Sequence, residues 1–369
     1  MSPAPTTALS TPPRLLEDVL IARTTELADQ TLRPQADHVA KFGVPRSHLE
    51  ALGRAGVLGL MTYQPAGPLN NEEVRREVAE LVAAADGSTW FVSHQHHQPV
   101  KEVAASANRE LRDKWLKAMV NGEVFGAEAT SHLRRTGSPA VVATPDRLGW
   151  RLSGRLPWLT GWFLADVFLV AAVTPDGQVL SMLLPCRTDN GIGEIRPQEL
   201  WGMNATGTVS VELRDVAVTP DQVIGSTSWD AWLRQDKYDR ADVNPGIYGT
   251  LRAATDFLVA SAPRSGPKYY DLGMALASEG AQLREQTYRL ADEFTSEKSL
   301  ADRQALRAAA LELTCRAGTA CIAASGATAM ITGSTASRLM GEALFHLARG
   351  QTAITRTAIA NRFIELISR

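Results

Sequence analysis

The chain has 369 residues with nearly balanced charges, 38 Lys and Arg against 40 Asp and Glu, and a formal net charge of −2. With 44% hydrophobic and 21% charged residues, the composition is that of a folded globular protein with a large core. This balance argues against nucleic acid or a membrane surface as the main partner, and no apolar run is long enough to span a bilayer. The three cysteines lack metal-binding or redox spacing, so we expect a reduced, cytoplasmic setting.

The N-terminal third is expected to be helical. Residues 1–13 are rich in Pro, Ser and Thr and are expected to form a flexible tail. Beyond them, apolar residues recur at steps of three and four, the period of a helix with one buried face. Ser47, which comes two residues after Pro45 and three before Glu50, is expected to cap a helix. The expected helices are 47–60, 72–85, 88–107 and 109–120.

The pattern changes in the middle of the chain. Residues 149–154 alternate between apolar and polar, and residues 209–218 alternate again. Between them, the apolar run 167–173, the turn Pro175-Asp176-Gly177 and the segment 178–184 predict a β-hairpin. Strands this closely spaced, with no helices between them, predict a compact antiparallel sandwich or barrel.

Helices return from about Tyr248. A break is expected over 262–267, where two prolines and a glycine occur. Ala-rich segments follow, and each is long enough to form one helix of a closely packed bundle. The expected bundle helices are 272–294, 300–330 and 336–367.

Three phrases in and around the strand region occur in a characteristic order. They are Gly122-Glu123-Val124-Phe125-Gly126-Ala127-Glu128, Trp158-Leu159-Thr160, and Met203-Asn204-Ala205-Thr206-Gly207 with the strand that follows. A small β-domain that carries these phrases between two helical bundles resembles the acyl-CoA dehydrogenase superfamily of flavoproteins, including its flavin-dependent monooxygenase branch.

The resemblance implies an α+β, mostly α fold with three domains. These are an N-terminal helical domain over 14–121, a central antiparallel β-domain over 122–228 and a C-terminal helical bundle over 229–369. It also implies a flavin cofactor, either FAD, FMN or a reduced flavin supplied by a separate reductase. A homodimer or homotetramer that buries the C-terminal helices is expected by the same resemblance.

The flavin-binding residues implied by the resemblance lie mainly in the β-domain. In the family, a Trp-x-Thr sequence covers the flavin ring and hydrogen-bonds near its reactive nitrogen, and this chain has Trp158 and Thr160 at that place. The simpler interpretation is that Trp158 fills the end of a sheet and Thr160 lies at a strand edge. Further candidate cofactor contacts are Ser131, Gly137, Ser138 and Thr352.

The C-terminal segment departs from the family at the position of its catalytic base. The resembled pattern has a glutamate that removes the α-proton of an acyl thioester, and here that position holds Arg349. A guanidinium keeps its proton at neutral pH and cannot act as a general base. Some family members place the base at the start of the first C-terminal helix, where Asp242 is the candidate substitute. Helix capping is the alternative role for Asp242.

Other candidate residues concern the substrate. His94, His96 and His97 would spread over roughly 200–300° of a helix, so they cannot share one metal ion and no metal site is expected. His94, as an acid or base, and His97 are candidates for lining the substrate pocket, with a structural role as the alternative. Arg134 would bind a phosphate of the flavin or of a pantetheine-bearing substrate, or else lie in a solvated loop. Trp201 would line a dry pocket.

Three functions stay open from the sequence. The first is a flavin-dependent dehydrogenase or oxidase that acts on an acyl thioester, bound to CoA or a carrier protein, with an atypical or missing base. The second is a two-component monooxygenase that takes reduced flavin from a flavin reductase and hydroxylates a small molecule in secondary metabolism. The third is a homologue without activity that serves as a binding or scaffold subunit.

Overall fold

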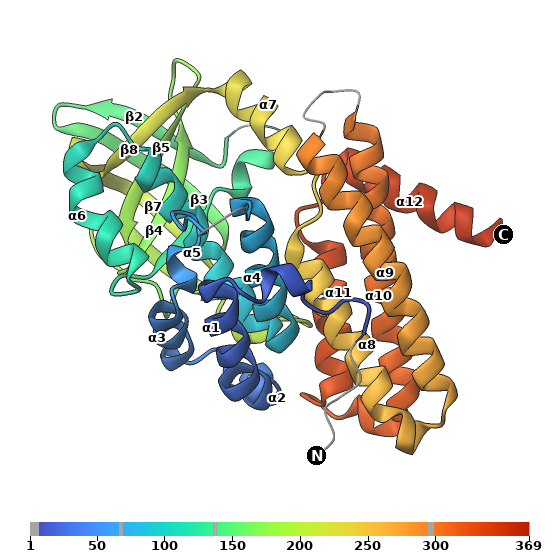
Figure 1. Ribbon diagram of the computed structural model, residues 1–369. Coiled ribbons are helices and arrows are strands. Elements are labelled where there is room, and N and C mark those ends of the chain that lie inside the picture. Colours follow the sequence, from blue (N-terminus) through green and yellow to red (C-terminus); the bar gives the residue numbers. More distant parts are fainter. Residues whose placement is uncertain (1–6, 66–68, 136, 138, 294–298, 369) are drawn as a thin grey trace.

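The computed structural model describes residues 7–65, 69–135, 137, 139–293 and 299–368. The N-terminal helices and the β-domain form one half of the molecule, and long C-terminal helices form the other half (Figure 1). One hydrophobic core joins the N-terminal helices to the interior of the sheet, and a second core fills the C-terminal bundle. Within the described residues, no helix has both the length and the apolar character to cross a bilayer.

The N-terminal helices confirm the periodicity of the sequence, but the helix expected over 47–60 ends at Ala55, where Gly56 is left-handed (φ 91°), and a 3₁₀ turn (Val57–Gly59) follows. Ser47 as a helix cap is wrong: the helix begins at Arg46 after Pro45, and Ser47 lies inside its first turn. Asp86 caps the longest of these helices by accepting a hydrogen bond from the Ser88 N–H. The helices are α1 (Val19–Leu27), α2 (Arg33–Phe42), α3 (Arg46–Ala55), α4 (Asn71–Ala85), α5 (Gly87–Ala105) and α6 (Arg109–Val120).

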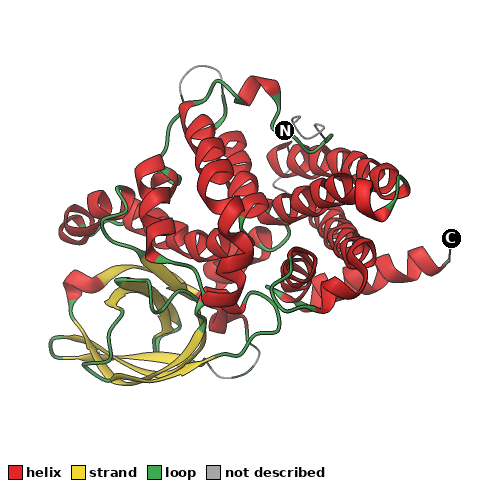
Figure 2. Ribbon diagram, turned by 90° about the horizontal axis from the view of Figure 1, so that it is seen from below, coloured by secondary structure: helices red, strands yellow, loops and turns green. Residues whose placement is uncertain are grey.

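The central strands form one eight-stranded sheet with the order β6-β7-β3-β2-β4-β5-β8, and β1 pairs with β4. The sheet curls round beside the helices (Figure 2). The predicted hairpin is confirmed by the antiparallel pairing of β4 with β5. Most pairs are antiparallel, but β4 runs parallel to β1 and meets β2 in parallel at one residue pair. The strands are β1 (Gly126–Ala129), β2 (Val141–Asp146), β3 (Gly149–Leu159), β4 (Val167–Val173), β5 (Gln178–Pro185), β6 (Ile192–Pro197), β7 (Val209–Val218) and β8 (Val223–Ser228).

The C-terminal helices include the expected break, which falls at Gly266 and Pro267. The prediction of one helix over 336–367 is wrong. The chain leaves the helix at Arg349, which is extended (φ −73°, ψ 138°), and Gly350 follows with φ 63°. A left-handed residue just after a helix end favours glycine and stops the helix. The helices are α7 (Trp229–Asp239), α8 (Pro245–Ser265), α9 (Lys268–Glu293), α10 (Leu300–Ser325), α11 (Thr335–Ala348) and α12 (Ala353–Ile367).

Candidate active site

A cavity of about 1080 Å³ lies where α5, the sheet, α7 and the C-terminal bundle meet. This volume is at the upper end of the usual range for small-molecule sites. Five residues singled out from the sequence line the cavity although they lie far apart in the chain: His94, His97, Arg134, Asp242 and Arg349. The cavity is therefore the candidate active site.

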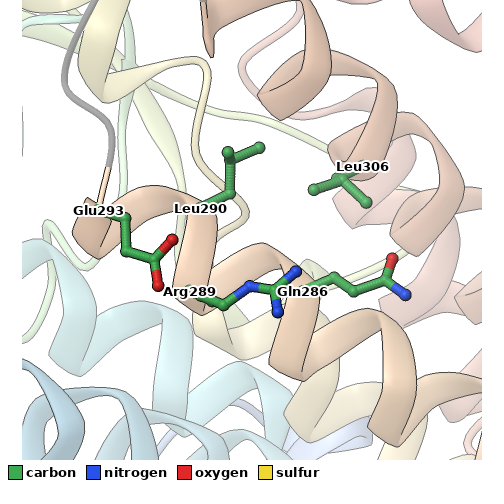
Figure 3. A pocket seen from close by; sticks show the side chains of 5 residues that line it. All are labelled: Gln286, Arg289, Leu290, Glu293 and Leu306. Atoms are coloured by element: carbon green, nitrogen blue, oxygen red, sulfur yellow. The ribbon is translucent and has the colours of Figure 1, made fainter.

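A second, smaller pocket of about 300 Å³ lies between α9 and α10. Figure 3 shows Arg289 and Gln286 on one helix facing Leu306 on the other. Its lining includes none of the residues singled out from the sequence, so it is not the candidate site.

His94 lies on the cavity wall in α5 and is held in one tautomer. The Gly246 N–H donates to Asn244 Oδ1 (3.0 Å), which turns the Asn244 amide nitrogen toward His94 Nε2 at 3.4 Å. Since an amide nitrogen can only donate, Nε2 accepts and the ring proton lies on Nδ1. Burial, together with the charge of Arg349 close by, lowers the pKa of His94 well below its ordinary value. His94 is therefore neutral at pH 7.

The neighbouring histidines have different partners. His96 donates from Nε2 to the Met119 carbonyl (3.1 Å) and accepts the Gly126 N–H at Nδ1 (2.8 Å), so it joins α5 to the end of α6 and to β1. His97 donates from Nε2 to the Val57 carbonyl (3.1 Å). Burial lowers the pKa to about 3 for His96 and about 4 for His97. The geometry gives His96 a structural role and leaves His94 with the freer ring.

Arg349 projects from the break between α11 and α12 onto two aromatic rings of α5. Its guanidinium carbon lies 4.6 Å from the ring centre of Phe91 and 5.8 Å from that of Trp90. Burial, with the nearby charges of Arg240, Arg307 and others, lowers the pKa of Arg349 to about 9. At pH 7 it still carries a full positive charge, so it stabilises negative charge rather than removing protons.

Asp242 lines the cavity but is not a free carboxylate. Arg303 donates to Asp242 Oδ1 at 2.6 Å. Burial raises the pKa of Asp242, and the bond to Arg303 opposes that shift. Its alternative role as a helix cap is wrong, because Asn244 caps α8. Glu128 of β1, whose carboxylate accepts the Thr130 hydroxyl, is another carboxylate of the cavity wall.

The aromatic candidates gather at one end of the sheet rather than in the cavity wall. Leu159 of β3 pairs with Val209 of β7, which pairs with Pro197 of β6, so these three strands meet at one end of the sheet. Trp158 is the last residue but one of β3, and Trp201 comes four residues after β6. Their exposed fractions are 46% for Trp158 and 77% for Trp201. An exposed aromatic surface of this kind fits a flat ring system such as isoalloxazine.

Thr160 is buried at this sheet end and belongs to a chain of three hydroxyls. The Thr206 hydroxyl donates to the Met203 carbonyl (2.8 Å), which can only accept. Thr208 must then donate to Thr206 (2.9 Å), and Thr160 must donate to Thr208 (2.9 Å). Each hydroxyl has one proton, so Thr160 keeps only its acceptor capacity for a bound group.

The remaining cofactor candidates lie elsewhere. Ser131 is exposed in the 3₁₀ turn after β1, and Gly137 is exposed in the loop beyond it. Thr352 caps α12 by accepting the Thr355 N–H (3.2 Å). Ser138 lies outside the described residues.

The sequence analysis missed two arginines of the cavity wall, Arg240 and Arg307. Arg307 directly precedes the run Ala308-Ala309-Ala310 in the Ala-rich α10, a place where an arginine is unusual unless it has a partner. An arginine within an Ala-rich segment can be recognised in the sequence. Arg240 has no such feature around it.

Comparison with known proteins agrees with this geometry. A sequence model of the "Acyl-CoA dehydrogenase, N-terminal domain" matches residues 17–123. The short-chain specific acyl-CoA dehydrogenase of Bos taurus mitochondria is 22% identical over 313 residues, 77% of this chain and 75% of that one. The structure of a glutaryl-coenzyme A dehydrogenase with glutaryl-CoA aligns with a TM-score of 0.78 at 17% identity, over 96% of both chains.

Dibenzothiophene monooxygenase (TdsC) from Paenibacillus sp. A11-2 aligns with a TM-score of 0.71 at 19% identity, over 94% of this chain and 97% of that one. The architecture is thus the acyl-CoA dehydrogenase fold, with two helical parts and a strand region between them. The predicted resemblance to the acyl-CoA dehydrogenase superfamily and the predicted fold class are confirmed.

Proposed function

We propose that this protein is a flavin-dependent monooxygenase that hydroxylates a small molecule in the cavity. The observation that carries the proposal is Arg349. The position that would hold the base for α-proton removal has a permanent cation, and its neighbourhood contains further arginines. A dehydrogenase of acyl thioesters depends on such a base, which contributes about 10²–10⁴ in rate. A monooxygenase has no need of it.

The residues of the sheet end fit a flavin, with Trp158 against the ring and Thr160 near its reactive nitrogen. Gly161, directly after Thr160, lies where an added Cβ would be 3.4 Å from Val92 of α5. Val92 precedes His94 by two residues, so the sheet end and the cavity share one helix. A bound reduced flavin would supply two electrons for the reduction of O₂. One oxygen atom of the O₂ would enter the substrate, and the other would leave as water.

The hydroxyl chain favours reduced over oxidised flavin. Thr160 can only accept, and the reactive nitrogen of a reduced flavin carries a hydrogen that can be donated to it. The same nitrogen of an oxidised flavin is an acceptor and would find no proton on Thr160. This preference matches a two-component enzyme that receives reduced flavin from a reductase.

Within the cavity, each residue has a defined task. Arg349 stabilises negative charge that develops on the reacting groups. Neutral His94 can donate from Nδ1–H to substrate or cofactor. Phe91, which is 7% exposed, packs under the Arg349 guanidinium and keeps water from that side of it.

One observation favours a dehydrogenase or oxidase as the second candidate. Asp242 and Glu128 are carboxylates in the cavity wall, and burial raises the pKa of Asp242, as a base near neutral pH requires. This candidate would use FAD and a thioester bound to CoA or a carrier protein. The ion pair of Asp242 with Arg303 weakens it, because the carboxylate already has a cationic partner.

We also propose that the protein is cytoplasmic and forms a homodimer or homotetramer through its C-terminal helices. The outermost helix, α12, extends away from the body of the molecule (Figure 1). Its exposed apolar side chains include Ile354, Phe363, Ile364 and Ile367. Self-association would bury them.

Anaerobic titration with oxidised and reduced FAD and FMN, followed by oxygen consumption, tests the function. We expect much tighter binding of reduced than of oxidised flavin. Thr208→Val should free the Thr160 proton and shift the preference toward oxidised flavin. The double change Trp158→Ala with Thr160→Val should weaken both, and Phe42→Ala, which removes a still more exposed ring from α2, should change neither.

The alternatives give different results in the same experiment. Stoichiometric FAD retained through purification and bleached by an acyl thioester would replace the monooxygenase with the dehydrogenase. Failure to bind any flavin would refute both the monooxygenase and the dehydrogenase proposals, and would support a binding or scaffold function.

A further inference from the structure

The cavity wall contains a cluster of four arginines drawn from separate parts of the chain. Arg134 follows β1, Arg240 follows α7, Arg307 lies in α10 and Arg349 lies between α11 and α12. The positive charges of these arginines lower one another's pKa values. Burial and the charge of Arg240 lower the pKa of Arg307 to about 10, and burial and the charge of Arg134 lower that of Arg240.

The carboxylates close to this arginine cluster do not neutralise it. Asp236 is shared, 2.7 Å from Arg134 Nη2 and 3.5 Å from Arg240 Nε. Glu128 acts on Arg349 and Arg240 through its charge, without an ion pair among those found in the described part of the chain. Asp239 acts on Arg240, and Asp242 acts on Arg307, through charge alone, and Asp242 is already ion-paired with Arg303. Among the described residues, only Asp236 forms ion pairs with members of the cluster.

Two members of the cluster form no ion pair with any carboxylate of the described residues. Arg307, which is 7% exposed, donates to the backbone carbonyls of Arg240 and Gly350, and its Nε is buried with no hydrogen-bond partner within the described residues. Arg349 contacts the rings of Phe91 and Trp90, and the described residues offer its guanidinium no hydrogen-bonded acceptor. Both arginines line the cavity and keep N–H groups that have no acceptor among the described residues.

Uncompensated guanidinium groups at a buried site are costly, because each loses hydration without gaining an anion. An oxoacid group would remove that cost, since its two or three oxygens accept paired N–H bonds from arginine and its charge offsets the excess. The cavity wall also has apolar residues, among them Leu60, Met61 and Ile224, against which the rest of a small molecule could pack.

We propose that the substrate carries an anionic oxoacid group, a carboxylate, sulfonate or phosphate, and that this group binds between Arg349 and Arg307. The proposal rests on the function proposed above, since it names the substrate class of the same cavity. Arg134 and Arg240 add positive charge behind the binding pair. The uncharged part of the substrate then extends along the apolar wall beside α5.

Isothermal titration calorimetry on the purified protein without added flavin tests this directly, with benzoate, its neutral counterpart benzamide, and inorganic phosphate as probes. We expect benzoate to bind at least tenfold more tightly than benzamide. Arg349→Met should weaken benzoate about tenfold to a hundredfold, the loss expected for a charged hydrogen bond, and leave benzamide unchanged. Arg349→Lys keeps the charge but not the paired donors, so its affinity for benzoate should lie between that of the unaltered protein and that of Arg349→Met.

Lys101→Met is the matched control, because Lys101 lines the same cavity in α5, is exposed, and carries the same charge. It should change benzoate affinity less than twofold. Tighter binding of phosphate than of benzoate would indicate that the anionic group of the substrate is a phosphate. Tighter binding of benzoate would indicate an organic acid. Circular dichroism and thermal melting verify that each variant is folded.

Three results would overturn the proposal: equal binding of benzoate and benzamide, equal effects of Arg349→Met and Lys101→Met, or loss of benzoate binding when saturating FMN is present. The last would mean that the flavin phosphate fills the cluster. Because the first measurements use no flavin, a protein that fails to bind flavin can still show the anion site, and the two failures remain distinct.

Discussion

Replacing Arg349 by methionine should make the protein more stable, although most substitutions of partly buried residues do the opposite. Burial lowers the pKa of Arg349 from 12.5 to about 9. At about 1.4 kcal/mol per pKa unit, keeping the charge in place costs about 5 kcal/mol if solvent screening is ignored. Since Arg349 lines the cavity and is partly exposed, about half of this is realistic.

The contacts with Phe91 and Trp90 offset part of that cost, by about 1 kcal/mol for a cation over aromatic rings. Methionine keeps much of the apolar contact with these rings and carries no charge. We therefore expect Arg349→Met to raise the free energy of unfolding by about 1–2 kcal/mol, measured by urea denaturation at pH 7 with an unchanged m-value.

The matched control is Arg338→Met, which removes a buried arginine whose charge is compensated. Arg338 donates to Asp37 and Glu342, each at 2.8 Å, and the pKa of its guanidinium is raised. Its removal should cost about 3–5 kcal/mol, since two carboxylates lose their partner. A loss of stability in Arg349→Met comparable to that of the control would refute the claim that Arg349 is uncompensated.

Further predictions concern pH, packing and assembly. The pKa of His96 is about 3 in the folded state and 6.5 in the unfolded state, so its contribution to stability is present above pH 6.5 and is lost as pH falls toward 3. His96→Gln should therefore flatten the decline in unfolding free energy between pH 7 and 5 by about 2 kcal/mol. Gly246→Ala should cost about 1–3 kcal/mol in chemical denaturation, because its Cβ would lie 2.2 Å from Trp90, whereas Gly193→Ala, with open space around it, should cost far less. Ile364→Asp should lower the mass found by light scattering if α12 forms the subunit contact, and an unchanged mass would exclude that contact.

Elements with strong local signals were predictable from the sequence. The helix over 109–120 has Asn108 as its cap, and the hairpin has its turn directly between two apolar runs, so both are confirmed almost to the residue. The break at Arg349 was missed because the apolar pattern of α11 continues across it. The capping role of Thr352 only becomes clear from its bond to the Thr355 N–H.

The candidate site was predictable only in part. His94, Asp242 and Arg349 were found because they stand at positions of a known pattern. The arginine cluster could not be found in this way, since Arg240, Arg307 and Arg349 come from a linker, a helix and another linker with no common period. The order of donors in the Thr160 chain is set by the Met203 carbonyl, and it reaches Thr160 only through the contact with Thr208, 48 residues along the chain.

The break between α11 and α12 ties the cavity mechanically to the outer edge of the molecule. The Gly350 carbonyl accepts from Arg307, and the Thr355 hydroxyl, in the first turn of α12, donates to Gln304 Oε1 (3.1 Å) on the same face of α10. α12 is thus anchored beside the arginine cluster at one end and extends outward at the other (Figure 1). A truncation that removes α12 would consequently release the backbone segment that positions Arg349. A displacement of the protruding end of α12 would likewise be transmitted to the position of Arg349 in the cavity wall.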